Sequence, residues 1–182
     1  MPYFLLGDHM NKERIKKKIK DIYPYVIVVI VVILIRTFIV TPAIVDGVSM
    51  KPNLQDKDII LLNKLDYKLD KIQRFDVVVV NWNGEKLVKR VVGLPGEHIE
   101  FKDNTLYVDG LVEIERYKHD ATSDFNLHSI GYLTLPGDKY FVIGDNRDDS
   151  IDSRVIGPID KKNILGKVTY RIFPVNKIKR VK

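Results

Sequence analysis

The hydrophobic residues of the chain form one long continuous run and, after it, a series of short runs. The long run begins with "IYPYVIVVIVVILI" (22–35), which carries no charge, and after Arg36 it continues as "TFIVTPAIV" to Val45. A helix needs roughly 20 mainly apolar residues to cross a bilayer. Arg36 lies late in the run, where its long side chain can reach a headgroup layer. Residues 22–45 are therefore predicted to form one transmembrane helix.

The short runs after Val45 have the features of β-strands, because they are rich in β-branched residues and are separated by Gly, Pro, Asn or Asp. The predicted strands are "DIILLNKL" (58–65), "DVVVVNW" (76–82), "KLVKRVVGL" (86–94), "TLYVDG" (105–110), "YLTL" (132–135), "KYFVIGD" (139–145) and "KVTYRIF" (167–173). Asn83-Gly84 is a strong hairpin signal, so Val77–Val80 and Lys86–Val92 are expected to pair antiparallel.

No segment after the long run shows helical periodicity, and no internal repeat is visible. One polar interruption covers about residues 113–130 and is most polar at "RYKHDATSDFNLH" (116–128). It is predicted to be an exposed loop or the rim of a small subdomain. The predicted fold class is mainly β, with an antiparallel β-sheet domain attached to one N-terminal transmembrane helix.

The distribution of charge supports this division. Residues 1–20 contain six Lys and Arg but only two Asp and Glu, so +4 of the formal net charge of +6 precedes the apolar run. Positive residues on that side predict a cytoplasmic N-terminus. The expected organisation is a cytoplasmic segment at 1–21, an anchor at 22–45 and an extracytoplasmic domain at 46–182. The +2 that remains is too small to predict a nucleic-acid-binding face.

A cleavable signal peptide is the alternative interpretation of the N-terminal segment. Its basic flank fits, but the apolar part of a signal peptide has roughly 7–15 residues and leads to an A-x-A-like cleavage site. The run in this chain is longer and no clear site of that kind follows it, which favours an uncleaved anchor. The chain also has no cysteine, which excludes disulfides, thiolate zinc sites and a cysteine nucleophile.

Ser49, in "VDGVSMKPNL" (45–54), is a candidate nucleophile. A serine near a glycine is usually a turn residue, and it becomes a nucleophile only where a base is available. The histidines of the chain lie in the N-terminal segment, in a predicted turn and in the polar interruption, so they do not support a Ser-His-Asp triad. These histidines are His9, His98, His119 and His128.

Lysine can replace histidine as the base where burial lowers its pKa toward the working pH. Lys89 and Arg90 are neighbours in the predicted strand 86–94, so their side chains point to opposite faces. One of these two cations must therefore approach the buried side. Lys89 is the candidate base, whereas Lys86 and Arg90 are expected to point to solvent.

A second polar cluster, "GDNRDDSIDSR" (144–154), directly follows a predicted strand and alternates acids and bases. Four of its residues have the i, i+2, i+4, i+6 spacing of a calcium loop: Asn146, Asp148, Ser150 and Asp152. However, Ile151 stands where that loop requires glycine, and Gly157 stands where it requires a bidentate glutamate. No metal site is therefore predicted.

Together these segments resemble the bacterial type I signal peptidases, which are membrane-anchored proteases that remove signal peptides from exported proteins. The resemblance extends from the anchor to about Val168. It rests on "GVSMKPNL", "RFDVVVV", "KRVVGLPGE" and "GDNRDDSIDSRVIGPI", which occur in the family's order and approximate spacing. The last two segments are long and specific.

The resemblance implies acyl transfer by a Ser-Lys dyad that uses no metal or organic cofactor. Ser49 corresponds to the nucleophile, Lys89 to the general base, and Ser150 to the serine whose hydroxyl orients the lysine amine. The oxyanion hole would use backbone N–H groups around Gly47 and Ser49. The remaining members of the cluster would form a polar scaffold beside the dyad: Asp145, Asp152 and Arg154.

The resemblance also implies the partners, namely signal peptides of secretory preproteins, membrane lipid and the protein translocation machinery. Small residues at the −1 and −3 substrate positions would need shallow pockets, and Ile44 and Val45 are candidates to line them. The substrates are either the bulk of exported proteins or a restricted, pilin-like set, and the sequence leaves this open.

Two other functions are alternatives to the protease. A catalytically idle assembly or chaperone protein of the same fold would be expected to lose Ser49 or Lys89, and both are present. A self-cleaving repressor shares the dyad chemistry, but it carries a DNA-binding helix pair where this chain has an apolar span.

Three positions depart from the family pattern. Gly47 stands two residues before the nucleophile, where some members use a serine hydroxyl as an oxyanion donor. Asn53 stands where threonine is common, and Phe75 stands where glycine often precedes the aspartate. None of these departures removes a catalytic group, so they concern rate and cleavage preference.

Overall fold

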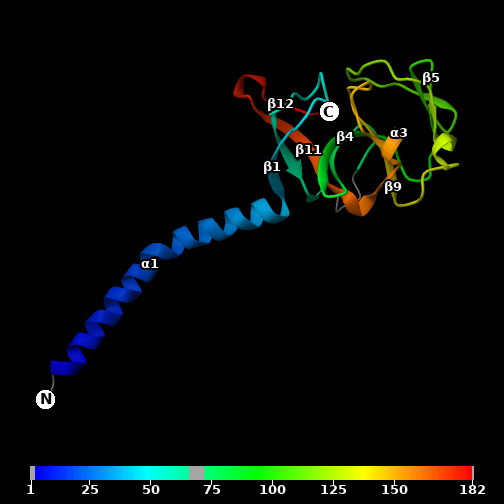
Figure 1. Ribbon diagram of the computed structural model, residues 1–182. Helices are drawn as coiled ribbons and strands as arrows, with labels where there is room; N and C mark the ends of the chain where they lie inside the picture. The colour runs from blue at the N-terminus through cyan, green and yellow to red at the C-terminus, as the bar shows by residue number, and fades with distance from the viewer. Residues whose placement is uncertain (1–2, 66–71, 182) are drawn as a thin grey trace. The chain divides into compact units, whose positions relative to one another are not determined.

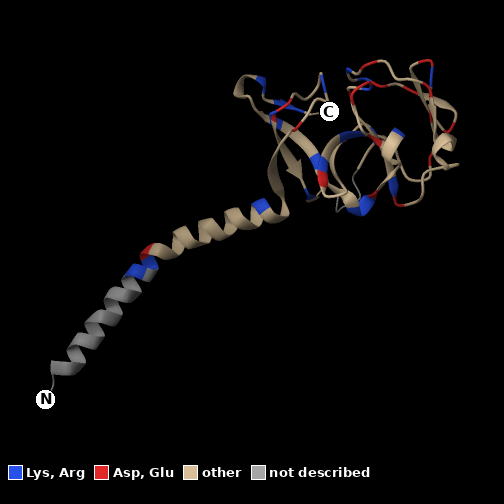
Figure 2. Ribbon diagram, in the orientation of Figure 1, with Lys and Arg blue, Asp and Glu red and all other residues tan. Residues whose placement is uncertain are grey.

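The computed structural model describes residues 3–65 and 72–181, and the chain divides into two units, residues 1–39 and 40–182. The first unit contains helix α1 (Tyr3–Phe38), with side chains described at residue 18 and from residue 20 onward. Within it, Lys20–Phe38 is long and apolar enough to cross a membrane, with a mean hydropathy of 2.1. In Figure 2 the charged residues at the start of this segment give way to an uncharged stretch that ends near Arg36. This composition suits a membrane anchor.

The helix ends at Phe38, ahead of the predicted boundary at Val45. Residues Val40–Ile44 instead form strand β1, which pairs antiparallel with β2 (Ile59–Asn63). Pro42 has no amide hydrogen and would break a helix, whereas an edge strand tolerates it. The predicted transmembrane helix is therefore too long at its C-terminal end, where the apolar residues belong to the β-rich unit.

The second unit is built mainly from antiparallel strands, as Figure 1 shows. After β2, its elements in chain order are β3 (Val77–Trp82), β4 (Glu85–Gly93), β5 (Ile99–Lys102), β6 (Thr105–Val108), β7 (Leu111–Glu113), β8 (Phe125–Asn126), η1 (Leu127–Ile130), β9 (Lys139–Ile143), α3 (Ser153–Ile156), β10 (Ile159–Asp160), η2 (Lys161–Asn163), β11 (Ile164–Phe173), η3 (Val175–Lys177) and β12 (Lys179–Arg180).

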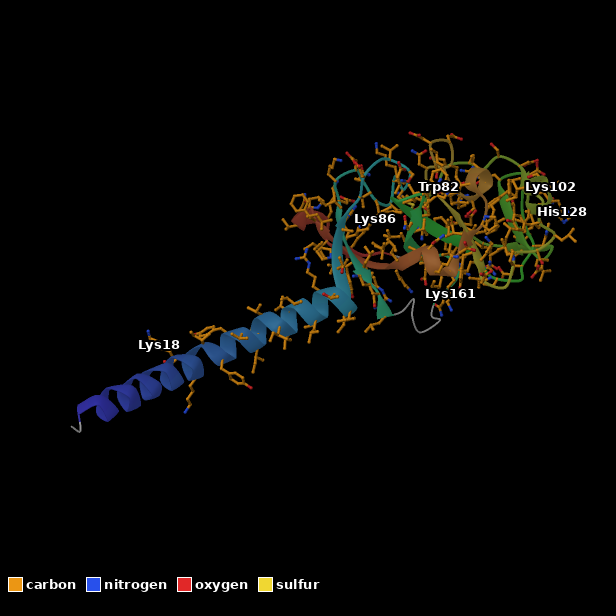
Figure 3. All side chains as sticks on the ribbon, turned by 60° about the horizontal axis from the view of Figure 1, so that its bottom comes forward. Lys18, Trp82, Lys86, Lys102, His128 and Lys161 are labelled. Carbon is orange, nitrogen blue, oxygen red and sulfur yellow. The ribbon has the colours of Figure 1, made fainter. Side chains whose placement is uncertain are left out.

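These strands form two sheets. The larger sheet has the order β1-β2-β11-β3-β4-β9-β10, with β12 paired to β11, and the smaller sheet has the order β7-β6-β5-β8. Figure 3 shows Lys86, on β4 of the larger sheet, well separated from His128, in η1 beside the smaller one. The predicted mainly β, antiparallel fold with one N-terminal apolar helix is confirmed.

The predicted hairpin around Asn83-Gly84 is also confirmed, because β3 and β4 pair antiparallel from Val77↔Arg90 to Trp82↔Glu85. Asn83 and Gly84 have φ values of +50° and +89°. This is the left-handed geometry of the two-residue turns that match the twist of a hairpin. All four residues of Val77–Val80 are buried, which explains why this strand reads as a continuous apolar run rather than as an alternating one.

Strand β4 becomes fully buried as it runs from Glu85 to Gly93. It lies between β3 and β9, and Val91 and Val92, which point to opposite faces, belong to two different apolar clusters. Both faces of the strand are therefore covered. Lys89 is 2% exposed and Arg90 is 0% exposed, so the expectation that Arg90 points to solvent is wrong.

Two other predictions on local structure need correction. Residues 132–135 form no strand; instead, the Leu135 backbone exchanges hydrogen bonds of 2.8 Å with Gly96 and Glu97. Most of the smaller sheet was also missed, since only its strand β6 lies within a predicted segment. Of the two possibilities for the polar interruption at 113–130, the structure supports the rim of a subdomain, because its strand β8 pairs with β5.

Candidate active site

The candidate nucleophile Ser49 lies in a turn between β1 and β2. Met50 and Leu54, on the same turn, are each 1% exposed and belong to an apolar cluster with Val77 and Val79 of β3. Ser49 itself is half-buried. The apolar side chains thus anchor the turn to the larger sheet and leave the serine accessible.

Two hydrogen bonds from Asn146 hold this turn against the cluster at 144–154, and Gly144, which directly follows β9, leaves room for the close approach. The Asn146 N–H donates to the Ser49 carbonyl oxygen at 3.0 Å, and Asn146 Nδ2 donates to the Val48 carbonyl oxygen at 3.3 Å. A Cβ added at Gly144 would lie 2.6 Å from both the Ser49 carbonyl oxygen and Ser150 Cβ. Only glycine fits there, and the sequence analysis did not identify this residue.

The Lys89 side chain extends from β4 to the loop that carries Ser150. Its Nζ donates a hydrogen bond of 3.1 Å to Ser150 Oγ. Burial lowers the pKa of Lys89 to about 8; the carboxylate of Asp152 acts against this shift and the guanidinium of Arg154 adds to it. The structure therefore brings Lys89 to Ser150 as predicted, and it brings the backbone of Ser49 to Ser150 through Gly144. Among the described residues, no hydrogen bond joins Lys89 Nζ to Ser49 Oγ.

The lowered pKa of Lys89 has consequences for both reactivity and stability. At pH 7 a pKa of about 8 leaves about a tenth of the amine neutral, against roughly one in three thousand for an ordinary lysine. Below pH 8 the folded protein holds a buried ammonium, which costs about 3 kcal/mol of stability relative to an exposed lysine. Between pH 8 and 10.5 the unfolded chain binds the extra proton, so this contribution improves as the pH rises.

Asp152 and Arg154 stabilise the loop that carries Ser150. Arg154 Nε and Nη2 donate to the buried Asp152 carboxylate at 2.9 Å each, and the Gly144 N–H donates to it at 3.0 Å. Asp152 also caps the short helix α3. Burial acts to raise the pKa of Asp152, but the hydrogen bonds and charge of Arg154, together with hydrogen bonds from Gly144 and Ser150, hold that pKa below its ordinary value. These contacts support the scaffold role expected for both residues.

Asp145, the third scaffold candidate, forms an ion pair with Arg90, and both side chains are 0% exposed. Arg90 Nε and Nη2 donate to the two carboxylate oxygens at 2.8 Å and 2.7 Å. The guanidinium also lies 3.8 Å from the centroid of the Tyr117 ring. The local sequence does not reveal the role of Arg90, because its partners come from distant segments.

Arg147 is a second buried cation whose role the local sequence does not reveal. It donates to the Gly144 carbonyl oxygen at 2.9 Å and to Glu115 at 2.6 Å, and it contacts the hydroxyl groups of Tyr117 and Thr122. Burial, with the nearby Glu115, raises the pKa of Tyr117 and keeps the phenol neutral. The polar interruption thus supplies partners for cations next to the candidate site. In agreement with this, its residues 113–120 alternate between half-buried and exposed.

Within residues 3–65 and 72–181, no group of three or more His, Asp or Glu is placed to hold a metal ion. Asp152, one of the residues with calcium-loop spacing, is engaged by Arg154. The chemistry that the site offers is instead that of a buried amine, two serines and a rigid polar scaffold.

Sequence comparison identifies the family. The sequence model of the family described as signal peptidase, peptidase S26, matches residues 18–173. The chain belongs to this family. Signal peptidase I P of Bacillus subtilis subsp. natto is 42% identical over 94% of this chain and 99% of its own length. Signal peptidase I V of Bacillus subtilis (strain 168) is 41% identical over 79% of this chain and 92% of its own.

A solved structure agrees with this assignment. A crystal structure of a signal peptidase I from Enterococcus faecalis V583 is 38% identical, with a TM-score of 0.51, and covers 54% of this chain and 97% of that one. The resemblance noted from the motifs is thus confirmed, and the protein is a peptidase by family. The names of these relatives give no support to the catalytically idle alternative.

Gly47, two residues before Ser49, has an unusual backbone conformation and a hydrogen bond to Asp56. Gly47 has a φ of +98°, a conformation that side chains disfavour, and its N–H donates to Asp56 Oδ1 at 2.9 Å. This hydrogen bond is the main cause that lowers the pKa of Asp56. Because the Gly47 N–H is engaged by Asp56, the backbone N–H of Ser49 is the better candidate for an oxyanion donor.

Phe75, where signal peptidases often have glycine, has a φ of +71°. Glycine adopts this left-handed conformation readily, whereas phenylalanine is strained in it. The strain is offset by packing, because the Phe75 ring lies 5.5 Å from the Tyr117 ring and against the apolar cluster of the smaller sheet. The Phe75 carbonyl oxygen also accepts from Arg90 Nη1 at 2.8 Å.

A groove of about 840 Å³ runs beside β1 and includes Asp46, three residues before Ser49. Its walls are mainly apolar and include Ala43 and Ile44 of β1 and Val88 of β4. Ile44 is 65% exposed and lines the groove as expected, but Val45 is 3% exposed and packs in the core. Val45 is therefore not part of the groove, against expectation, because its side chain packs with Met50 and Leu54 in the core.

Proposed function

We propose that this chain is a signal peptidase I that removes N-terminal signal peptides from exported preproteins by a Ser49-Lys89 dyad. The observation that carries the proposal is the Lys89 amine, which is almost completely buried, has a pKa of about 8, and is hydrogen-bonded to Ser150 beside the Ser49 turn. Membership of the signal peptidase family and the names of the relatives support the substrate class.

The proposed reaction proceeds by acyl transfer. The neutral Lys89 amine accepts the Ser49 Oγ proton while this oxygen forms a bond to the scissile carbonyl carbon. The backbone N–H of Ser49 donates to the oxyanion. The Lys89 ammonium then gives its proton to the leaving amine as the peptide bond breaks. Lys89 next deprotonates a water molecule, which attacks the acyl-enzyme and releases Ser49 with the proton returned to it.

Ser150 has a geometric role in this mechanism. Its hydroxyl oxygen accepts one hydrogen from Lys89 Nζ, and the hydroxyl also interacts with the Asp152 carboxylate. This contact fixes the rotation of the amine and so the direction of its lone pair. Asp152, Arg154 and Asp145 keep the loop that presents Ser150 in place.

The groove beside β1 is the proposed substrate site. Because β1 is the first strand in the order of the larger sheet, an extended peptide can add to its outer edge by main-chain hydrogen bonds. The apolar walls then favour small apolar side chains near the cleaved bond. Neither a metal nor an organic cofactor takes part in these steps.

Cleavage of a purified preprotein tests the proposed function. The full chain in mild detergent is expected to cut the preprotein at one site, and N-terminal sequencing of the product is expected to give the mature protein's first residues. Ser49→Ala should abolish cleavage. Ser129→Ala is the matched control, because Ser129 is exposed beside the smaller sheet, and it should cleave as the wild type does. Cleavage by Ser49→Ala at the wild-type rate would exclude Ser49 as the nucleophile.

We further propose that α1 anchors the enzyme with its N-terminus in the cytoplasm and its β-rich unit outside, where it meets lipid and the translocation machinery. The lysines that precede the apolar span support this orientation. A protease should be added to cells whose cytoplasmic membrane is intact but whose outer layers are permeable to it. It should digest the β-rich unit and spare a tag fused at Met1. Lysed cells serve as the control, in which both should be digested. The opposite pattern in intact cells would reverse the orientation.

A further inference from the structure

We propose that Asn53 is a positioning residue that fixes the nucleophile turn relative to the strand that carries the base. The proposal rests on the Ser49-Lys89 mechanism above. Asn53 stands where the family often has threonine, and the structure gives its side chain a contact set that threonine cannot reproduce.

The Asn53 side-chain amide connects three segments of the chain. Its Nδ2 donates to Asp145 Oδ2 at 2.7 Å and to the Lys118 carbonyl oxygen at 2.7 Å. Asn53 lies four residues after Ser49, next to the buried Leu54. The nucleophile turn is thereby joined both to the cluster at 144–154 and to the polar segment at 113–130.

The acceptor Asp145 is also the partner of the strand that carries Lys89. Its two carboxylate oxygens accept from Arg90, which directly follows Lys89 on β4, and both partners are fully buried. Asp145 Oδ2 is shared, since it accepts both from Arg90 Nη2 and from Asn53 Nδ2. One buried carboxylate therefore sets the position of the nucleophile turn and of the base strand at the same time.

The choice of asparagine follows from the donors available. A side-chain amide has two N–H groups, which match the two acceptors, whereas a threonine hydroxyl has one. Threonine can keep the bond to Asp145 but not both bonds. Aspartate has no donor when ionised and would place a second negative charge against Asp145. Leucine is close to asparagine in size and would leave both acceptors without this partner.

The expected effect falls on turnover rather than on substrate binding. A shift of the turn changes the approach of Ser49 Oγ to the base and to the scissile carbonyl, and misplacement on the order of 1 Å can reduce a rate about 10²-fold. Asn53 is not among the residues that line the groove beside β1. Loss of the Asn53 contacts should therefore lower kcat and leave KM nearly unchanged.

The test compares kcat and KM for preprotein cleavage by the full chain in mild detergent, at a temperature at which every variant is folded. Asn53→Leu should lower kcat roughly tenfold to a hundredfold with KM within about twofold of wild type. Asn53→Asp should lower kcat at least as much, whereas Asn53→Thr should keep kcat within a few-fold of the wild-type value. The matched control is Asn126→Ala, which removes another asparagine hydrogen bond, to the His128 N–H beside the smaller sheet, and should leave kcat unchanged.

Amide hydrogen exchange supplies a second readout that does not depend on cleavage. Asn53→Leu should speed exchange at residues 48–54, and Asn53→Thr and Asn126→Ala should not. If Asn53→Leu does not fold, Asn53→Ala, which also has no side-chain donor, takes its place in both measurements. Wild-type kcat together with wild-type exchange in the folded variant would overturn the positioning role. Failure of the wild type itself to cleave would refute the proposed function, and the exchange data alone would then decide the role of Asn53.

Discussion

Lys89→Arg is expected to lower kcat/KM for signal-peptide cleavage by at least ~10³-fold, with Lys89→Ala equally impaired. Arginine has a pKa above 12 and stays protonated even when buried, so it cannot accept the Ser49 proton. Lysine can, because burial has already brought the pKa of Lys89 to about 8. The measurement is the initial rate of preprotein cleavage at pH 8 with each variant in the same detergent.

Two further variants make this result specific to the base. Lys102→Arg, at an exposed position on β5 of the smaller sheet, should cleave as the wild type does. Ser150→Ala should fold normally and lose roughly ten- to a hundredfold in kcat, since Lys89 keeps its burial but loses the hydrogen bond that orients its amine. Near-normal activity in Lys89→Arg would refute the assignment of Lys89 as the base.

Asp145→Ala is expected to lower the free energy of unfolding by about 3–5 kcal/mol, because it leaves the Arg90 guanidinium buried without its carboxylate. The same substitution removes an acceptor of Asn53, so activity should fall together with stability. Chemical denaturation of the full chain in mild detergent, followed by fluorescence of Trp82, measures the change.

Asp46→Ala is the matched control for the Asp145 prediction. Asp46 also forms an ion pair, with Lys57 at 2.6 Å, but its side chain is 86% exposed. Surface ion pairs contribute roughly 0–1 kcal/mol, so this variant should unfold almost as the wild type does. Equal unfolding curves for Asp145→Ala and Asp46→Ala would show that the Arg90–Asp145 pair is not the structural centre of the site.

The parts of the fold that the sequence predicted are those determined by local patterns. The valine run at 77–80 and the Asn83-Gly84 dipeptide identify the β3–β4 hairpin without knowledge of any other strand. The smaller sheet escaped prediction because β5 and β7 are only four and three residues long. The signals that mark its hairpins are Asp103-Asn104 and Asp109-Gly110, which have positive φ values like the Asn83-Gly84 turn.

The candidate site shows the same limit at the level of single residues. Alternation along β4 correctly required one buried cation, but it could not show that Arg90 is buried as well. Its burial depends on Asp145 and Tyr117, which come from distant segments that cover the other face of the strand. In the same way, nothing near Gly47 in the sequence shows that its N–H is bound by Asp56.

The pH dependence of kcat tests most directly whether neutral Lys89 is the base. Cleavage of one preprotein should be measured from pH 6 to 10 with the full chain in mild detergent. We expect kcat to rise about tenfold per pH unit at low pH and to level off above an apparent pKa of about 8, the value that burial gives Lys89. A rate that is independent of pH over this range, or one that still rises tenfold per unit up to pH 10, would contradict this account.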